Sequence, residues 1–322
     1  MRTVLFQACL IFCVSVSQGA AADRVIVRGD NEYQPLKLNE LSSNTQIDLN
    51  GTRFRVAISG NDNPTEAANC DTGNAPLNRY PFAVLNSPDV AIDGGLFAGE
   101  APLTSDWLHT YCNSTAVRLE TSPGATVREM RIRRAWDGIR IGRETSGFRL
   151  SRVWMSEVRD DCIENDHLMP GRIRDSLLDG CFAGISVAPV DDDLSAQPMV
   201  EIVRVLLRMK QYPYRGELRH ALPIKLKRKN AKFNIRDSVF AVETTNLIGA
   251  KNIQLMWESI AKCRDNKLLW LGEGELPEIY AGAPKCFTIV TGAQAHEIWA
   301  KERQNWIADN KGVARFTTDV VQ

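Results

Sequence analysis

The sequence has no surplus of either charge: its 322 residues include 39 lysines and arginines and 39 aspartates and glutamates. A balanced chain lacks the broad basic surface of proteins that bind nucleic acids without sequence preference, which argues against that class. After the first 22 residues, no apolar run approaches the about 18 residues that a membrane-spanning helix needs. We therefore expect a soluble mature protein without a membrane span.

Several catalytic and cofactor motifs are also missing. The sequence has no serine-centred nucleophile elbow, no HExxH, no phosphate-binding P-loop and no dinucleotide GxGxxG in a strand-to-helix context. It has no CxxC pair either, which argues against a zinc site. We therefore expect no required cofactor, with calcium as the one candidate considered below.

The first 22 residues have the composition of a secretory signal. Arg2 precedes an apolar run from Val4 to Val16, and the small residues Ala20, Ala21 and Ala22 follow. This pattern predicts cleavage before Asp23 and a secreted or periplasmic protein. Six cysteines remain after the signal, and an even number in an oxidising compartment favours disulfides. Their positions are Cys70, Cys112, Cys162, Cys181, Cys263 and Cys286.

Sequence proximity predicts two of the disulfides, Cys70 with Cys112 and Cys263 with Cys286. Cys162 and Cys181 lie at different positions of successive repeats, so a bond between them requires a bend in the backbone. They are either a third disulfide or buried thiols.

The middle of the chain contains a repeated segment. Val117, Ile139, Ile163, Ile185 and Ile224 occupy equivalent positions, at steps of 22, 24, 22 and 39 residues. Each repeat opens with alternating apolar residues, a glycine or polar turn follows, and a second alternating run comes next. No helix-length segment separates these strands, which excludes βαβ units. The pattern predicts an all-β solenoid with at least two strands in each coil.

This repeat resembles the pectate-lyase-like superfamily of right-handed parallel β-helix proteins, and most closely its uncharacterised bacterial right-handed β-helix repeat subgroup. The resemblance covers residues 86–242 and includes the run RDDCIENDHLMPGRIRDSLLDGCFAGIS. It implies a right-handed single-stranded parallel β-helix. We expect an N-terminal cap with first coils over 23–80, the β-helix core over 81–260 with a loop insertion at 189–222, and a closing segment over 261–322. This last segment includes a C-terminal helix that Thr291 caps and that Ile298, Trp299, Trp306 and Ile307 bury.

Stacking of the coils places side chains in ladders on the outer surface. If Ile163 points inward, then Glu164 and Asp166 point outward, between cations of the neighbouring coils. The expected first ladder is Arg118, Arg140, Glu164, Ser186 and Lys225, and the second is Glu120, Gly142, Asp166, Ala188 and Lys227.

We select Asp160, Asp161, Glu164, Asp166 and His167 as catalytic candidates. Paired carboxylates serve as acid and base or nucleophile in glycoside hydrolysis, and histidine carries protons near neutral pH. Asp161, Glu164 and Asp166 also supply hard oxygen ligands suited to calcium. The alternative for Asp160 and Asp161 is a turn-capping role. The run from Asp160 to Ile163 resembles the DDC-I segment of polygalacturonase-type hydrolases, where one aspartate of the pair is catalytic. Those enzymes carry a His-Gly one coil later, where this chain has Ala183-Gly184.

Cations and aromatic residues near this coil complete the expected site. The candidates for substrate binding are Arg140, Arg143, Lys225, Lys227 and Tyr214. Cations that hold a uronate carboxylate beside a base would serve a lyase or an epimerase. The leading hypothesis is therefore an exported polysaccharide lyase or epimerase that acts on or binds an acidic polysaccharide. The alternatives are a non-catalytic glycan-binding or envelope-structural protein, and a glycoside hydrolase with paired carboxylates. We expect a polysaccharide as the partner and no nucleic acid.

Overall fold

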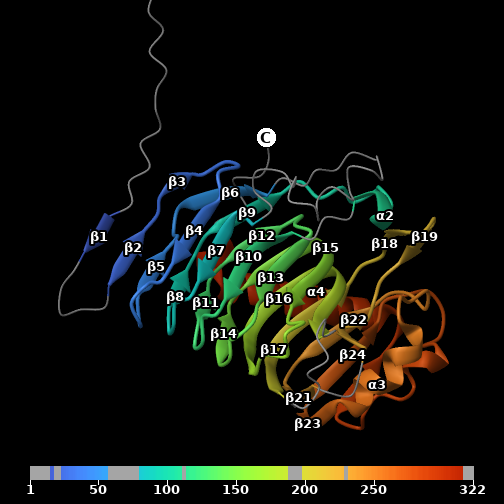
Figure 1. Cartoon of the computed structure of the whole chain (residues 1–322). Coiled ribbons are helices and arrows are strands. Elements are labelled where there is room, and N and C mark those ends of the chain that lie inside the picture. The colour runs from blue at the N-terminus through green and yellow to red at the C-terminus, as the bar shows by residue number, and fades with distance from the viewer. Residues whose placement is uncertain are drawn as a thin grey trace, which may run out of the picture.

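The chain folds mostly into short strands that pair in parallel, and a long helix lies near its C-terminus. The structure, a computed structural model, describes residues 15–17, 23–56, 80–110, 114–187, 198–227 and 231–314. The expectation of a mostly-β protein with a parallel sheet and a C-terminal helix is confirmed (Figure 1). No helix among the described residues combines the length and apolar character needed to span a membrane. The predicted signal peptide, residues 1–22, lies outside the described residues except for the strand Ser15–Ser17.

The strands are β1 Ser15–Ser17, β2 Arg24–Ile26, β3 Gly29–Asp30, β4 Leu36–Asn39, β5 Gln46–Asp48, β6 Thr52–Val56, β7 Phe82–Leu85, β8 Ala91–Asp93, β9 Leu96–Gly99, β10 Thr115–Glu120, β11 Thr126–Arg128, β12 Arg131–Arg133, β13 Asp137–Ile141, β14 Phe148–Ser151, β15 Trp154–Glu164, β16 Gly171–Val187, β17 Met199–Met209, β18 Tyr212–Tyr214, β19 Glu217–Arg219, β20 Ile224–Leu226, β21 Lys232–Arg236, β22 Val239–Val242, β23 Ile260–Arg264, β24 Asn266–Trp270 and β25 Phe287–Val290. The helices are α2 Trp107–Thr110, α3 Ile253–Glu258, α4 Gly292–Asp309 and α5 Lys311–Ala314, with the single 3-10 turns η1 Ala250–Asn252 and η2 Glu278–Tyr280.

The strands repeat in sets of three, and each set pairs with the next. β10 pairs with β13, β11 with β14 and β12 with β15, all in parallel. The long strand β15 bends and serves two of the three positions, and β16 serves all three, so each pairs with several neighbours. The five residues predicted to be equivalent are in register from one coil to the next: Val117, Ile139, Ile163, Ile185 and Ile224.

The interior of the coils is a continuous apolar core. Ile139, Ile163 and Ile185 are at most 1% exposed, because their side chains stack in the same inward column. Towards the N-terminus this column continues through Val117 to Phe82. In the column of β6 and β9, Phe54 stacks on Phe97 with ring centroids 4.8 Å apart. Stacking of the coils removes the apolar surface of these side chains from water, and this burial holds successive coils together.

One corner of the coils is made by residues with left-handed backbone angles. They are Glu129, Arg152, Asp175, Arg204, Asp237 and Asp265, with φ between 50° and 56°. The residue that follows this corner uses its side chain to bind the backbone of a neighbouring coil. Ser176 Oγ accepts the amide hydrogen of Val153 at 3.2 Å, and Ser238 Oγ accepts that of Val205 at 3.1 Å. The corner therefore bends the chain sharply without leaving these buried backbone amides unpaired.

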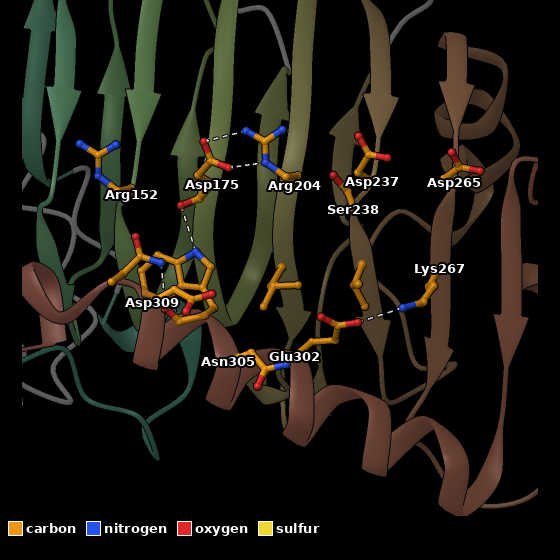
Figure 2. A pocket seen from close by; sticks show the side chains of 14 residues that line it. Arg152, Asp175, Arg204, Asp237, Ser238, Asp265, Lys267, Glu302, Asn305 and Asp309 are labelled. Carbon is orange, nitrogen blue, oxygen red and sulfur yellow. Dashed lines mark hydrogen bonds and ion pairs between the residues drawn. The ribbon is translucent and has the colours of Figure 1, made fainter.

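Helix α4 covers the outer face of one part of the sheet. Trp299 and Trp306 are buried against Trp154, and Trp306 Nε1 donates to the carbonyl of Asp175 at 3.0 Å. The predicted helix and its apolar stripe are thus confirmed. It begins directly after Thr291, although that side chain makes no capping hydrogen bond. Helix α4 packs on a face of the coils (Figures 1 and 2).

Two disulfides connect described residues. Cys263 bonds to Cys286, as predicted, and Cys162 bonds to Cys181, the pair that the sequence left open. The predicted Cys70–Cys112 bond lies outside the described residues. Within the expected insertion at 189–222, β17 pairs in parallel with β16 and β21 as a regular part of the coils, and β18 with β19 forms a hairpin.

Candidate functional site

Three buried aspartates meet on the outer surface of two adjacent coils. Asp137 begins β13, and Asp160 and Asp161 lie within β15 on the next coil. One carboxylate oxygen of each lies within 4.8 Å of the others, and the residues are 4%, 8% and 4% exposed. The amide of Asp161 donates to Asp137 Oδ1 at 3.0 Å, which joins the two coils at this point.

A break in strand alternation turns these aspartates outward. A Cβ atom at Gly138 would lie 2.5 Å from Met155 Sδ in the core, so position 138 faces inward, as its neighbour Ile139 also does. In β15, Cys162 and Ile163 are likewise both core residues, and the strand register is irregular between Val158 and Asp161. Two consecutive inward positions leave the preceding aspartate on the outer side. We expected Asp160 and Asp161 at a turn before the strand, and that expectation is wrong, because both belong to β15.

The first outward ladder forms as predicted. Arg118 pairs with Arg140, Arg140 with Glu164, Glu164 with Ser186 and Ser186 with Lys225. From the end of this ladder the Lys225 side chain crosses the small Ser186 and reaches back towards the aspartates. Its Nζ lies 2.7 Å from Asp161 and 4.0 Å from Asp160 Oδ1.

Arg140 joins the ladder to the aspartates from the other side. Its Nε donates to Glu164 Oε2, and its Nη2 donates to Asp137 Oδ2 at 3.2 Å. Its Nη1 donates to the hydroxyl of Tyr80 at 3.0 Å. With only 12% of its side chain exposed, Arg140 is a fixed part of the site.

Burial and mutual repulsion hold protons on this cluster. Burial raises the pKa of Asp160 to about 7, and repulsion from Asp161 adds to the rise. Burial also raises the pKa of Asp161, to about 6, although Lys225 opposes the change. The pKa of Asp137 rises well above its usual range through burial and the charge of Glu164. A carboxyl of this cluster therefore retains its proton near neutral pH.

The cations of the site keep their charge. Burial alone would lower the pKa of Lys225 and of Arg140. The carboxylates around Lys225 outweigh burial and raise its pKa, and Glu164 with Asp137 does the same for Arg140. Neither side chain is available as a base at physiological pH.

The remaining predicted catalytic residues lie at the end of β15. Asp166 accepts a hydrogen bond from Ser186 Oγ at 2.6 Å and contributes to the charge around Asp161. Glu164 is held by Arg140, and burial raises its pKa. His167 is half-buried in the turn after β15.

The remaining substrate-binding candidates lie away from the carboxylates. Arg143 and Lys227 are exposed. Tyr214 belongs to an aromatic cluster, with ring centroids 5.5 Å from Trp107 and 5.8 Å from Phe182. The structure therefore gathers five predicted residues into one site: Asp160, Asp161, Glu164, Arg140 and Lys225.

Two residues of the site were not selected from the sequence. Asp137 lies one coil before Asp161 at the equivalent position, so projecting the repeat backwards from the aspartate pair would have identified it. Tyr80 precedes the first regular strand of its coil, where no repeat pattern exists to place it.

The donor set of the aspartates fits a metal ion poorly. Three clustered carboxylates offer the oxygen ligands that calcium prefers. However, Lys225 Nζ lies 2.7 Å from each oxygen of Asp161, in the place a cation would take. Of the calcium ligands expected from the sequence, Glu164 is bound to Arg140 and Asp166 to Ser186. A retained proton and Lys225 therefore account for the charge of the cluster without a metal.

A larger groove, of about 630 Å³, lies between α4 and the corner residues of the coils (Figure 2). Its walls are charged, and most of these charges are paired. Arg204 binds Asp175 at 2.6 Å, and Lys267 binds Glu302 at 2.9 Å. This groove has no buried carboxyl with a raised pKa like those of the aspartate cluster among its described lining residues. We therefore place the candidate site at Asp137, Asp160 and Asp161.

Comparison with known proteins finds no matching family model, no similar curated protein and no similar solved structure. Function must therefore be inferred from the site itself.

Proposed function

We propose that this chain is an exported right-handed single-stranded parallel β-helix protein, of the pectate-lyase-like type, that hydrolyses glycosidic bonds of a polysaccharide. The three-strand coils paired in parallel support this fold, and the two disulfides are consistent with an oxidising extracellular or periplasmic environment. The observation that carries the proposed function is the cluster of Asp137, Asp160 and Asp161, whose carboxylates lie within 4.8 Å of one another.

The roles follow from how each carboxyl is held. Asp160 keeps a proton near neutral pH and is the general acid that protonates the leaving oxygen. Asp161 is held in its charged form by Lys225 and is the nucleophile that attacks the sugar. Carboxylate oxygens within 4.8 Å of one another suit the close carboxyl pair of a retaining hydrolase, because the wider pair of an inverting enzyme is what leaves room for an attacking water. Asp160, deprotonated in the first step, then activates the water that releases the sugar from Asp161. Asp137 accepts the Asp161 amide hydrogen and fixes the spacing of the two coils. Two carboxyls with different pKa values at one site form the acid and nucleophile pair that retaining hydrolysis requires.

This arrangement favours hydrolysis over the lyase or epimerase expected from the sequence. Those reactions need a base for the C5 proton, and arginine or lysine would have to be neutral to serve. Lys225 and Arg140 are instead held protonated by Asp161 and Glu164. The exposed cations Arg143 and Lys227 support an acidic polymer as the substrate.

The experiment incubates the purified mature protein with acidic and neutral polysaccharides, with calcium or with a chelator. New reducing ends without absorbance of unsaturated uronates support hydrolysis. Both signals together would show a lyase, and neither signal on any polymer would favour a binding or structural role. Asp160→Asn and Asp161→Asn should each lower turnover by roughly 100-fold or more. Asp175→Asn is the control, because Asp175 is a coil-corner residue paired with Arg204.

A further inference from the structure

A second, smaller cleft lies on the face of the coils that α4 partly covers. It has a volume of about 260 Å³ and is bordered by β12, β15, β16, β17 and one residue of α4. This is several times the roughly 30 Å³ that one water molecule occupies in the liquid. Its cationic lining residues are Arg131, Arg208, Lys210 and Arg303. It is separate from the aspartate cluster, and the inference below does not depend on the proposed function.

Arg131 is a buried charge that forms no ion pair with any residue the structure describes. It is 6% exposed, and its guanidinium lies over the ring of Trp154, 4.2 Å from the ring centroid. Its hydrogen-bond acceptors among the described residues are neutral: two backbone carbonyls and Ser156 Oγ, the latter at 2.6 Å. Burial lowers the pKa of Arg131 to about 9, so the group is still charged at neutral pH. A buried charge is stabilised by a counter-ion, and among the described residues no carboxylate lies in ion-pair contact with it.

The carboxylates at the cleft are already shared by other cations. Asp179 accepts from Arg303 at 2.6 Å and lies 3.6 Å from Arg208. Glu157 lies 3.7 Å from Lys210 and also contacts Arg133. Arg208 also binds Glu243, at 3.3 Å. Three carboxylates, Glu157, Asp179 and Glu243, therefore face the four lining cations and Arg133, and positive charge is in excess.

The cleft also contains a donor that is not used. Arg208 Nε is buried and has no hydrogen-bond acceptor within the described part of the chain. A buried N–H group without an acceptor costs free energy unless a ligand or water supplies one. An oxyanion at this position would accept from Arg208 and compensate the charge of Arg131 at the same time.

We propose that this cleft binds an oxyanion, namely the carboxylate, sulfate or phosphate group of a glycan or the corresponding free ion. The planar guanidinium groups of Arg131, Arg208 and Arg303 suit such groups, because each presents paired N–H donors to two oxygens. Lys210 adds a mobile point charge at the edge of the cleft. Bound there, an anionic sugar unit would hold a polymer on the face of the coils that α4 partly covers, independently of turnover at Asp161.

Isothermal titration calorimetry on the full chain at low ionic strength tests this site, with sodium sulfate, sodium phosphate and sodium glucuronate as probes. Sodium chloride at equal ionic strength is the reference, because it corrects for general screening. The variant Arg208→Leu with Lys210→Met removes two partly exposed cations of the cleft. The matched control is Arg172→Leu with Lys232→Met, which removes two cations elsewhere on the coils.

We expect saturable binding of at least one probe by the wild type. The dissociation constant should rise about tenfold or more in the cleft variant, as expected for the loss of a charge-assisted hydrogen bond, and stay unchanged in the control. Binding of glucuronate identifies a glycan carboxylate, whereas binding of sulfate or phosphate alone identifies an ester group or the free ion. The proposal is overturned if no probe binds saturably, or if the cleft variant binds as tightly as the wild type.

Discussion

Lys225 Nζ lies 2.7 Å from Asp161, although the two residues are 64 positions apart and belong to coils that are not adjacent. The intervening coil presents Ser186, which is small enough to let the lysine side chain pass over it. Strands stack about 4.8 Å apart, so Lys225 spans roughly two strand spacings to reach the aspartate. Charged side chains of non-adjacent coils therefore interact directly, across the coil that carries Ser186.

Replacing Lys225 should move the pH dependence of activity. Lys225 lowers the pKa of both Asp160 and Asp161, so Lys225→Met raises both values. The acid limb of the rate profile, which reports ionisation of the Asp161 carboxylate, should shift to higher pH, and kcat should fall. Lys262→Met serves as the control because Lys262 is exposed on β23, on a later coil. A profile unchanged in Lys225→Met would remove Lys225 from the site.

The stability of the protein should depend on Asp160 between pH 4 and pH 7. Its folded pKa of about 7 exceeds the unfolded value of about 3.9, so the folded chain binds more protons in this range. This contribution is complete below about pH 4 and is lost as the pH rises through about 7. Asp160→Asn should therefore gain stability relative to the wild type with rising pH, by the order of a few kcal/mol.

Urea unfolding of both proteins at several pH values measures this difference. The wild type alone is a poor test, because His220 acts in the opposite direction. Burial lowers the pKa of His220 to about 4, so its contribution is present above about 6.5 and is lost as the pH falls through 4. Taking the difference between Asp160→Asn and the wild type cancels the histidine term. A difference independent of pH would show that Asp160 titrates normally.

The two disulfides should differ in their effect on activity. Each closes a loop of about 20 residues, and removal of either should cost about 3 kcal/mol. Cys162 directly follows Asp161, so Cys162→Ala with Cys181→Ala should also reduce turnover. Cys263→Ala with Cys286→Ala is the matched control and should lose stability alone. Equal turnover in the two double variants, measured below their melting temperatures, would contradict a positioning role for the Cys162–Cys181 bond.

Helix α4 should depend on Trp306 for its attachment. The ring packs edge-on against Trp154 with centroids 6.1 Å apart, and its Nε1 donates to Asp175. Trp306→Ala should cost about 3–5 kcal/mol and expose the segment from 292 onward to proteases. Differential scanning fluorimetry and limited proteolysis measure both effects, with Glu297→Ala on the exposed side of the helix as the control. Protease resistance like that of the wild type would show that other contacts hold α4.

The repeat in the sequence was sufficient to predict the register of the coils. Val117, Ile139, Ile163, Ile185 and Ile224 are in register because each fills the same inward position, and a shift by one residue would expose it. The ladder from Arg118 to Lys225 follows from the same register. The C-terminal helix was predictable as well, because its tryptophans recur at helical spacing.

What the sequence did not predict depends on local departures from the repeat. Strict alternation cannot show that Gly138 and Ile139 both face inward, and this break is what turns Asp137 towards Asp161. The Cys162–Cys181 bond needs a similar bend at Cys162. Sequence spacing also does not show that the Lys225 side chain extends across a neighbouring coil to Asp161.

The fold depends on contacts between adjacent coils, whereas the candidate site depends on side chains from several successive coils. Asp137, Asp161, Ser186 and Lys225 lie on four successive coils, and each coil is bonded mainly to its neighbours. Duplication of one whole coil between β16 and β20 would preserve every inward column, yet it would carry Lys225 one strand spacing farther from Asp161. Such a chain would keep its fold but lose the contact between Lys225 and Asp161. The number of coils, as much as residue identity, therefore determines whether Lys225 can reach Asp161.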